Sequence, residues 1–395
     1  MDTFYRPTRV EISLDALYHN IRAFRHYIPE SISLMAVIKA DAYGHGAVQV
    51  AREALTCGVD YLAVAFLDEA LELRRAGVSA PILVLGHTPV DGISLAAENN
   101  ITLTVYSNEA LDALASRPTS APVVTIHIKI DTGMGRIGLY CLEDASAFIT
   151  RALSLPGVKV EGLYTHYACA DESDKTCTLE QHSKLKAVVD HFAEQGISFP
   201  YVHAGNSAAA IDTPELTYNM VRLGIGMYGL YPSEEVDKER IELRPVMSIK
   251  TGVVMLKPVP LGSGISYGHR YHTKQDGEMI ATLPVGYADG YSRLLTGKAQ
   301  ALIQGQRVPV VGTICMDQCM IDVSAITGAA VGDEVVILGR QGEEMISAEE
   351  LAAELGTINY EIVCMISHRV PRVYTRNGRA VYTVNHLRHE MDIDE

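Results

Sequence analysis

The chain has 395 residues, of which 48% are apolar and 21% charged, and its 33 Lys and Arg against 48 Asp and Glu give a formal net charge of −15. This length predicts two domains, or one large barrel with an appendage, and the composition is typical of a globular protein and not of a disordered chain. The acidic balance argues against nucleic acid or an anionic membrane as the main partner, but it leaves room for a local cationic pocket.

The sequence contains no apolar run of the length that a membrane-spanning helix requires, and its first residues do not read as a signal peptide. We therefore expect a cytoplasmic protein that has no membrane partner. The seven cysteines are scattered, and the closest pair, Cys315 and Cys319, lacks the further ligands of a zinc site. Reduced thiols and no metal are the expectation.

Short apolar runs alternate with helical stretches over the first two-thirds of the chain. The eight expected strands cover residues 34–39, 61–65, 82–85, 102–105, 125–130, 162–166, 201–205 and 220–224. This alternation predicts a (β/α)8 barrel of the TIM-like type. A doubly wound sheet is the alternative, but the turn after the first strand reads ADAYGHG (40–46) and not GxGxxG.

The pattern changes after Leu230. Residues 231–245 are polar and read as a linker, and from Val246 onward come β-rich runs separated by Gly, Pro and Asp turns. One helix is expected between Ser347 and Gly356, with a capping box formed by Ser347 and Glu350. We therefore expect a barrel over residues 1–240 and a mostly β C-terminal domain over residues 241–395.

The strand TIHIKID (125–131) has two different faces. Its isoleucines share one face, while His127, Lys129 and Asp131 share the other. In a barrel the isoleucine face meets the helices, so the Lys and His face must point inward. Similar polar groups lie at or near the ends of other strands, namely Lys39, His166, His203 and Arg222.

The carboxyl ends of barrel strands open on one rim, where barrel enzymes place their chemistry. A lone Lys or His at such a place is more often a surface charge or a satisfied core residue, but several together indicate an anion site for phosphate or carboxylate. Further donors follow the seventh and eighth strands, at Asn206, Ser207, Gly224 and Ile225. On spacing alone, phosphate binding and ordinary turn chemistry explain these four equally well.

A series of motifs along almost the whole chain resembles the alanine racemase family. The first, AVIKADAYGHG (36–46), is similar to the family's pyridoxal-phosphate attachment motif. It is followed by KIDTGMGRIG (129–138), THYACADE (165–172), HAGNSAA (203–209), VRLGIGMYG (221–229), SYGHRY (266–271), VGYADGYSR (285–293), GTICMDQ (312–318) and TINYEI (357–362). In relatives an N-terminal strand packs with the β domain, and the sequence leaves open whether the strand at about residues 8–13 does so here.

The resemblance implies pyridoxal 5'-phosphate as cofactor, held by Lys39 as an internal aldimine. It implies that Arg222 faces the pyridine nitrogen and is linked through His166 to Tyr267 and on its other side to His203. The remaining cofactor contacts that it implies are Tyr43, Arg136, Asn206, Ser207, Gly224, Ile225 and Tyr360.

Two bases would act on opposite faces of the α-carbon, Lys39 on one and Tyr267 of the partner subunit on the other. Arg136 and the backbone N–H of the partner subunit's Met316 would bind the substrate carboxylate. The resemblance further implies that Lys129 is carbamylated and so holds Arg136. Asp171, Tyr287 and Arg293 match positions that line the substrate entrance in relatives.

The activity implied by the resemblance is interconversion of L- and D-alanine by a homodimer with shared active sites, supplying D-alanine for peptidoglycan. A racemase of broader range that also acts on serine is the alternative within the same class. A fold-related decarboxylase and a non-catalytic pyridoxal-phosphate-binding barrel protein are further alternatives. The last class lacks a C-terminal β domain, whereas about 150 residues follow the barrel here.

Overall fold

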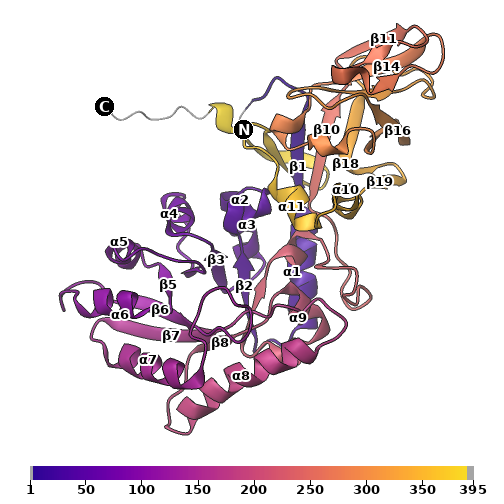
Figure 1. The fold of residues 1–395 in the computed structure, drawn as a ribbon. Helices are drawn as coiled ribbons and strands as arrows, with labels where there is room; N and C mark the ends of the chain where they lie inside the picture. Colours follow the sequence, from indigo (N-terminus) through magenta and orange to yellow (C-terminus); the bar gives the residue numbers. More distant parts are fainter. Residues whose placement is uncertain (1–2, 389–395) are drawn as a thin grey trace, which may run out of the picture. The chain divides into compact units, whose positions relative to one another are not determined.

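The computed structural model describes residues 3–388, which form two compact units (Figure 1). Of the described residues, the barrel unit comprises 17–42 and 46–244, and the β unit comprises 3–16, 43–45 and 245–388. Both units are discontinuous in sequence, whereas the sequence analysis predicted a single domain boundary after residue 240. Within the described residues, no helix combines the length and apolar character needed to cross a bilayer.

The barrel unit is built on eight parallel strands, in the spatial order β8-β7-β6-β5-β4-β3-β2-β9. They are β2 (Ser33–Val37), β3 (Tyr61–Val64), β4 (Ile82–Val84), β5 (Thr102–Val105), β6 (Val124–Lys129), β7 (Val158–Tyr164), β8 (Tyr201–His203) and β9 (Met220–Leu223). The gap between β8 and β9 is bridged by Asn219, whose N–H donates to Val202 O (3.3 Å), and by Arg222, whose N–H donates to Gly205 O (3.1 Å). The predicted (β/α)8 barrel is therefore confirmed as a nearly closed barrel.

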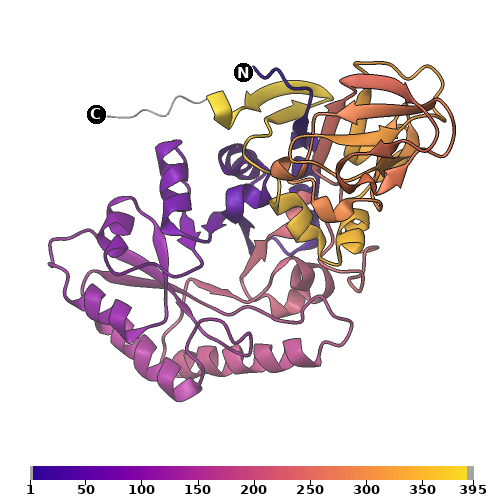
Figure 2. The same ribbon diagram turned by 45° about the horizontal axis from the view of Figure 1, so that its top comes forward.

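Helices follow the strands and lie outside them, as α6 to α8 show in both views (Figures 1 and 2). They are α1 (Leu14–Tyr27), α2 (Lys39–Tyr43), α3 (Ala47–Thr56), α4 (Leu67–Arg75), α5 (Gly92–Glu98), α6 (Asn108–Ala115), α7 (Leu142–Ser154), α8 (Thr176–Ala193) and α9 (Ser207–Asp212), with short 3-10 turns η1 (Pro214–Leu216) and η2 (Ile225–Tyr228). Helix α4 illustrates the local code, because Glu69 in its first turn accepts from Ala65 N (2.6 Å) and Phe66 N (3.1 Å), and Arg74 and Arg75 close it.

The β unit contains a twisted sheet whose main path runs β11-β14-β17-β16-β15-β18-β10-β1-β20-β21, with β19 on β18. These strands are β1 (Arg9–Ser13), β10 (Met247–Gly252), β11 (Met255–Val259), β14 (Glu278–Leu283), β15 (Gln300–Ile303), β16 (Gln306–Val311), β17 (Cys319–Asp322), β18 (Glu334–Gln341), β19 (Glu344–Ile346), β20 (Arg372–Arg376) and β21 (Arg379–Val384), beside a separate pair β12 (Gly264–Ile265) and β13 (Tyr271–His272). Strand β1 pairs antiparallel with β10 and parallel with β20, so the N-terminal strand belongs to this sheet.

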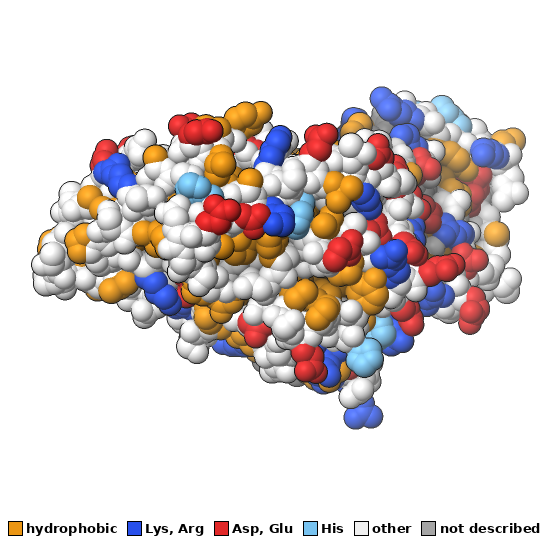
Figure 3. All heavy atoms as spheres, turned by 90° about the horizontal axis from the view of Figure 1, so that it is seen from below, with side chains coloured by type: hydrophobic (Ala, Val, Ile, Leu, Met, Phe, Trp, Pro, Cys, Tyr) orange, Lys and Arg blue, Asp and Glu red, His pale blue; other side chains and the backbone are white. Residues whose placement is uncertain are grey.

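Two helices and several 3-10 turns complete the β unit. They are α10 (Ala348–Leu355), α11 (Asn359–Cys364), η3 (Tyr267–His269), η4 (Tyr287–Asp289), η5 (Arg293–Leu295) and η6 (His386–Arg388). Helix α10 begins as predicted, with Ser347 Oγ accepting from Glu350 N (3.1 Å), and ends at Gly356 in the left-handed region (φ 70°). On the molecular face drawn in Figure 3, acidic and basic side chains are interspersed.

Candidate active site

Lys39 lies two residues beyond the end of β2 and opens a turn of left-handed helix. Four consecutive residues, Ala40 to Tyr43, have φ between 53° and 54°. Residues with a Cβ lose about 1–2 kcal/mol each in this conformation. The turn is held by Asp41, whose Oδ1 accepts from Ala47 N (2.8 Å) and whose carbonyl accepts from Gly46 N (2.9 Å). Backbone strain of this kind is typical of functional sites.

Four basic side chains lie within electrostatic range of His166, which follows β7. Burial, followed by the charges of Arg222, Lys129, Arg136 and Lys39, holds the pKa of His166 well below its ordinary value. His166 is therefore a neutral imidazole at neutral pH. Its surroundings are strongly electropositive, so this end of the barrel is suited to an anion.

Arg222 is the most constrained of these cations, being only 3% exposed on β9. Its Nη1 donates to His203 Nδ1 (2.8 Å), and its Nη2 lies 3.0 Å from His166 Nδ1. Nη2 also donates to the carbonyls of Thr165 (3.0 Å) and Ala204 (2.9 Å). Burial lowers the pKa of Arg222 to about 10, so the guanidinium stays charged at neutral pH. No carboxylate is among the hydrogen-bond partners that the described chain offers it.

Lys129, at the end of β6, is a buried amine among cations. It is 3% exposed, and its Nζ lies 4.3 Å from the centre of the Tyr164 ring. Burial, with Arg222 and Arg136 nearby, holds the pKa of this amine well below its ordinary value. The Arg136 backbone is positioned by the next turn, because Asp131 accepts from the N–H groups of Gly133, Gly135 and Arg136 (3.0 Å each).

A cradle of N–H groups lies where β8 and β9 end. Asn206 caps α9 by accepting from Ala209 N (3.0 Å), and the buried Ser207 Oγ accepts from Gly224 N (2.9 Å) and Gly226 N (3.2 Å). This brings the N-terminus of α9 beside that of η2, which begins at Ile225. Two adjacent helical N-termini and a hydroxyl form a suitable place for a phosphate.

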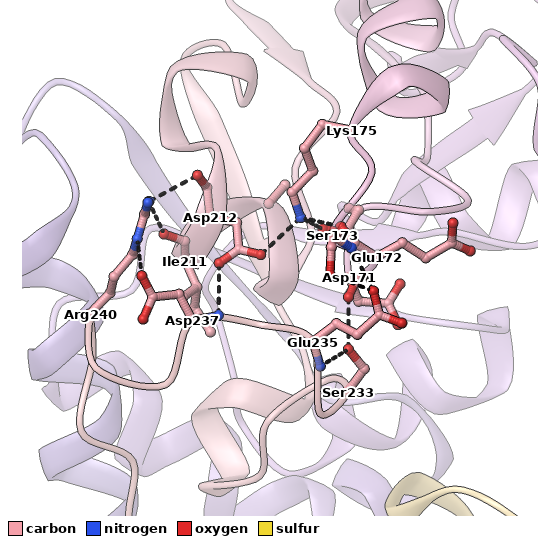
Figure 4. A network of polar contacts seen from close by, with 12 residues as sticks. Asp171, Glu172, Ser173, Lys175, Ile211, Asp212, Ser233, Glu235, Asp237 and Arg240 are labelled. Atoms are coloured by element: carbon pink, nitrogen blue, oxygen red, sulfur yellow. Dashed lines mark hydrogen bonds and ion pairs between the residues drawn. The ribbon is translucent and has the colours of Figure 1, made fainter.

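The loop that follows His166 is tied to the segment after η2 (Figure 4). Ser233 Oγ donates to the carbonyl of Asp171 (2.7 Å), while Glu235 Oε2 accepts from both N and Oγ of Ser173 (2.7 Å each). Figure 4 also shows the ion pairs Lys175–Asp212 (2.8 Å) and Arg240–Asp237 (2.9 Å). The Asp171 loop is therefore fixed at several points and does not depend on one contact.

In the β unit, Tyr43 and Tyr360 lie close together, with ring centroids 6.2 Å apart. Tyr360 comes from α11, and a Cβ at the intervening Gly44 would collide with the carbonyl of Val363 on the same helix. Burial raises the pKa of Tyr43, so its phenol is a neutral hydrogen-bond donor. Two of the cofactor contacts that the resemblance implies are thus brought together.

Tyr267 and Met316 lie on two interlocked loops of the β unit, and both are exposed (72% and 53%). Ser266 Oγ donates to Thr313 O (2.6 Å), and Thr313 Oγ1 donates in return to Tyr267 O (2.7 Å). Ser266 itself has a φ of 62°, a strained value beside the expected base. The exposed Tyr267 phenol is therefore accessible to groups outside its own loop.

Tyr287 and Arg293 belong to the same group of loops. Tyr287 N donates to Cys315 O (3.0 Å), and Thr296 Oγ1, just after η5, accepts from Ile314 N (3.1 Å). The sequence-predicted residues thus form two sets: the barrel carries the cations and the N–H cradle, and the β unit carries Tyr43, Tyr360, Tyr267, Met316, Tyr287 and Arg293.

Sequence reasoning did not single out Tyr164 and Glu161 of β7. Tyr164 stacks on His203 with ring centroids 4.6 Å apart, and alternation in the predicted strand 162–166 would have placed it beside His166 on one face. Glu161 precedes that predicted strand. The register between β6 and β7 shifts here, with Ile126 opposite Val160 but His127 opposite Gly162, so the bulge at Glu161 breaks the alternation.

Comparison with known proteins identifies the family of this chain. A family model described as alanine racemase, N-terminal domain, matches residues 12–232, and its C-terminal counterpart matches residues 246–374. The chain is 46% identical to an alanine racemase of Clostridium perfringens over 388 residues, covering 98% of this chain and 100% of that one. It is 50% identical to an alanine racemase of Methanococcus maripaludis over 369 residues, covering 93% and 98%.

Solved structures agree with the sequence comparisons. The alanine racemase of Bacillus anthracis with bound L-Ala-P matches with a TM-score of 0.92 at 44% identity, covering 98% of this chain and 99% of that one. An alanine racemase of Clostridium difficile matches with a TM-score of 0.91 at 43% identity, covering 98% and 100%. With both domains matched, the chain belongs to the alanine racemase family of isomerases.

Proposed function

We propose that this chain interconverts L- and D-alanine in the cytoplasm with pyridoxal 5'-phosphate, as a homodimer with shared active sites, and so supplies D-alanine for peptidoglycan. The observation that carries this proposal is the buried contact of Arg222 with His166 (3.0 Å) and His203 (2.8 Å) in a chain of this family. The family depends on pyridoxal phosphate, which acidifies the α-hydrogen of an amino acid when it is bound, by withdrawing electrons from the α-carbon.

The residues present fit this cofactor. The backbone N–H groups and the hydroxyl around Ser207, Gly224 and Ile225 would hold its phosphate, and the phenols of Tyr43 and Tyr360 would be further donors. Lys39 would hold the cofactor covalently, and Asn206 lies beside the cradle as the cap of α9. His166 would lie against the ring, because it is held by the same Arg222 that we place opposite the pyridine nitrogen.

Racemisation requires a proton acceptor on each side of the α-carbon. Lys39 would exchange the proton of D-alanine, and Tyr267 of the partner subunit would exchange that of L-alanine. A phenol with a reference pKa of about 10 is a weak base at neutral pH, so a neighbouring positive charge must favour its ionised form. Arg222 supplies such a charge through the neutral His166.

Substrate orientation and side reactions are controlled by charge. Arg136 and the backbone N–H of the partner's Met316 would bind the carboxylate of alanine, while Asp171, Tyr287 and Arg293 would screen entry. We also propose that the uncharged form of the Lys129 amine, which burial favours, adds to CO2 and loses a proton, giving a carbamate that holds Arg136. A permanently charged Arg222 disfavours protonation of the pyridine nitrogen, which limits side reactions.

Exchange of α-hydrogen with heavy water tests the two-base scheme one side at a time. In the cofactor-loaded Tyr267→Phe variant, we expect exchange into L-alanine to fall by about a hundredfold or more, because the acceptor is lost. Exchange into D-alanine should persist, since Lys39 remains, and proton NMR separates the two. Wild-type exchange of both enantiomers in this variant would contradict the scheme.

Two controls accompany this experiment. Tyr18→Phe removes a half-exposed phenol of α1 and should leave both exchange rates unchanged. Lys39→Ala should remove the absorbance band of protein-bound pyridoxal phosphate, and an unchanged band would refute the attachment site. A panel of L-amino acids completes the test, because turnover of L-serine equal to that of L-alanine would favour the broader racemase.

A further inference from the structure

A line of polar side chains runs from Arg222 through the interior of the barrel to Glu161. Arg222 Nη1 donates to His203 Nδ1 (2.8 Å), His203 Nε2 lies 2.9 Å from His127 Nδ1, and His127 Nε2 lies 3.5 Å from Glu161 Oε2. The line crosses four strands, β9, β8, β6 and β7. Both imidazoles are fully buried, whereas the Glu161 side chain is 14% exposed.

Glu161 lies toward the opposite end of the barrel from Lys39. The Tyr61 hydroxyl, from the first residue of β3, donates to Glu161 Oε2 (3.0 Å) and lies 2.6 Å from Thr102 Oγ1 at the start of β5. Lys159 Nζ, more than half exposed, donates to Glu161 Oε1 (2.8 Å). The line therefore connects the electropositive rim to the amino-terminal mouth of the barrel.

Arg222 determines the direction of the hydrogen bonds along the line. A guanidinium can only donate, so His203 Nδ1 must accept, and the proton of this neutral imidazole is on Nε2. His203 then donates to His127 Nδ1, which leaves the proton of His127 on Nε2, facing Glu161. His127 Nε2 is buried and makes no hydrogen bond within the described chain. The Glu161 carboxylate, at 3.5 Å, lies within electrostatic range of the proton on this nitrogen.

The two ends of the line carry opposite charges, and the imidazoles between them are neutral. Burial lowers the pKa of both His127 and His203, so both rings are neutral. The contact with His127 lowers the pKa of Glu161 to about 2, so its carboxylate is ionised. Arg222, which has no acidic hydrogen-bond partner, thus has a negative charge at the far end of two polarised imidazoles.

The backbone of β7 is irregular where it meets this line of side chains. The bulge in β7 leaves Glu161 unpaired with β6, and a bulge of this kind redirects a side chain. A Cβ at the next residue, Gly162, would lie 2.8 Å from both Cε1 and Nδ1 of the His127 ring. On the other side, the Tyr164 ring stacks against His203. Strand β7 therefore leaves room for His127 and aims a carboxylate at it.

We propose that Glu161 is a positioning residue of the racemase, which acts through His127 and His203 to fix the tautomers of both imidazoles and the orientation of the Arg222 guanidinium. This inference rests on the role that the proposed function gives to Arg222. Without the carboxylate, the proton of His127 has no fixed acceptor, and the opposite tautomer of His203 would point an N–H at Arg222. The guanidinium would then lose one of its anchors.

The tautomers can be measured in the wild-type, cofactor-loaded protein without any variant. Nitrogen-15 NMR of histidine-labelled protein, with resonances assigned by His127→Gln and His203→Gln, should show protons on Nε2 of both rings at neutral pH. A proton on Nδ1 of either ring, or a doubly protonated ring, would overturn the inference. This readout does not depend on activity or on the stability of a variant.

Three variants then test the consequence. Glu161→Gln should give mixed tautomers at His127 and His203 and a kcat about tenfold lower, with KM changed less, because the guanidinium is loosened. Glu161→Asp should largely restore the wild-type tautomers and the wild-type kcat. Lys159→Gln leaves the carboxylate in place and should behave as wild type. Unchanged tautomers and kcat in Glu161→Gln would refute the positioning role. The two-base scheme would still stand if Tyr267→Phe lost exchange of L-alanine.

Discussion

At the scale of single residues, Lys129 shows how the interior of the barrel alters ordinary chemistry. Burial and the charges of Arg222 and Arg136 lower the pKa of this amine in the folded chain, so the folded chain binds its proton less tightly than the unfolded chain, whose ordinary pKa is 10.5. The unfolded state therefore binds the extra proton, and the buried amine costs stability that is recovered only as pH rises toward that ordinary value. Conversion to an anion between Arg222 and Arg136 would remove this cost.

This argument predicts a carbamate on Lys129. Protein equilibrated with carbon-13-labelled bicarbonate at neutral pH should show one carbamate resonance in the carbon NMR spectrum, because a neutral amine is the form that adds CO2. Lys129→Gln should lack the resonance, and Lys159→Gln, which removes an exposed lysine, should keep it. Depletion of CO2 should lower the Tm of the wild type. Identical spectra for the wild type and Lys129→Gln would exclude the carbamate.

At the scale of elements, the left-handed turn after Lys39 stores strain in residues that have a Cβ. Ala40 is exposed and has a φ of 53°, and its N–H donates to Glu69 Oε1 (2.6 Å), a bond that any residue could make. Glycine adopts this conformation without the steric cost. The turn is thus a place where the chain has given up stability beside the residue that holds the cofactor.

We predict that Ala40→Gly raises the free energy of unfolding by about 0.5–1 kcal/mol, because relief of strain exceeds the entropy that glycine adds to the unfolded chain. The matched control is Ala187→Gly, at an exposed position of the regular helix α8, which should lower the free energy of unfolding by about 1 kcal/mol. Urea unfolding of the three proteins measures both. If Ala40→Gly lowered the free energy of unfolding as much as Ala187→Gly does, the turn would be unstrained.

The elements also explain what the sequence could predict. All eight barrel strands are apolar runs bounded by turn residues, and each was found within a few residues. The inward side of β6 followed from its alternating isoleucines, and this correctly placed His127 and Lys129 inside. Alternation could not find Glu161, because a bulge changes the phase of β7 at that residue. The sequence KADAY (39–43) also does not predict a left-handed turn, because contacts such as that of Asp41 with Ala47 impose this conformation.

At the scale of the whole molecule, the proposed bases come from different units of the chain, and in the proposed dimer from different subunits. Lys39 belongs to the barrel unit and Tyr267 to the β unit. If the sites are shared, each site takes its lysine from one chain and its tyrosine from the other, and both are repeated by the twofold symmetry of a homodimer.

Subunit mixing tests this arrangement. Lys39→Ala and Tyr267→Phe should each be inactive in racemisation, but co-expression should restore about a quarter of wild-type activity, since half of randomly formed dimers are heterodimers and each holds one intact site. Lys39→Ala mixed with Arg222→Ala should restore nothing, because both lesions lie in the barrel. If heterodimers are demonstrated but racemisation activity is not restored, both bases of a site must come from the same chain.

Residues 43–45, which begin with the last residue of the left-handed turn, belong to the β unit, whereas the residues on either side of them belong to the barrel unit. Tyr374 Oη donates to the carbonyl of His45 (3.0 Å), and Arg372 Nε donates to that of Gly44 (3.3 Å), while β1 from the first residues of the chain lies between β10 and β20. The two halves of the gene are therefore interwoven. A hybrid that joined residues 1–240 of this chain to the second half of a distant relative would bring mismatched neighbours at two places remote from the joint, and recombination at the polar linker would need compensating changes at both.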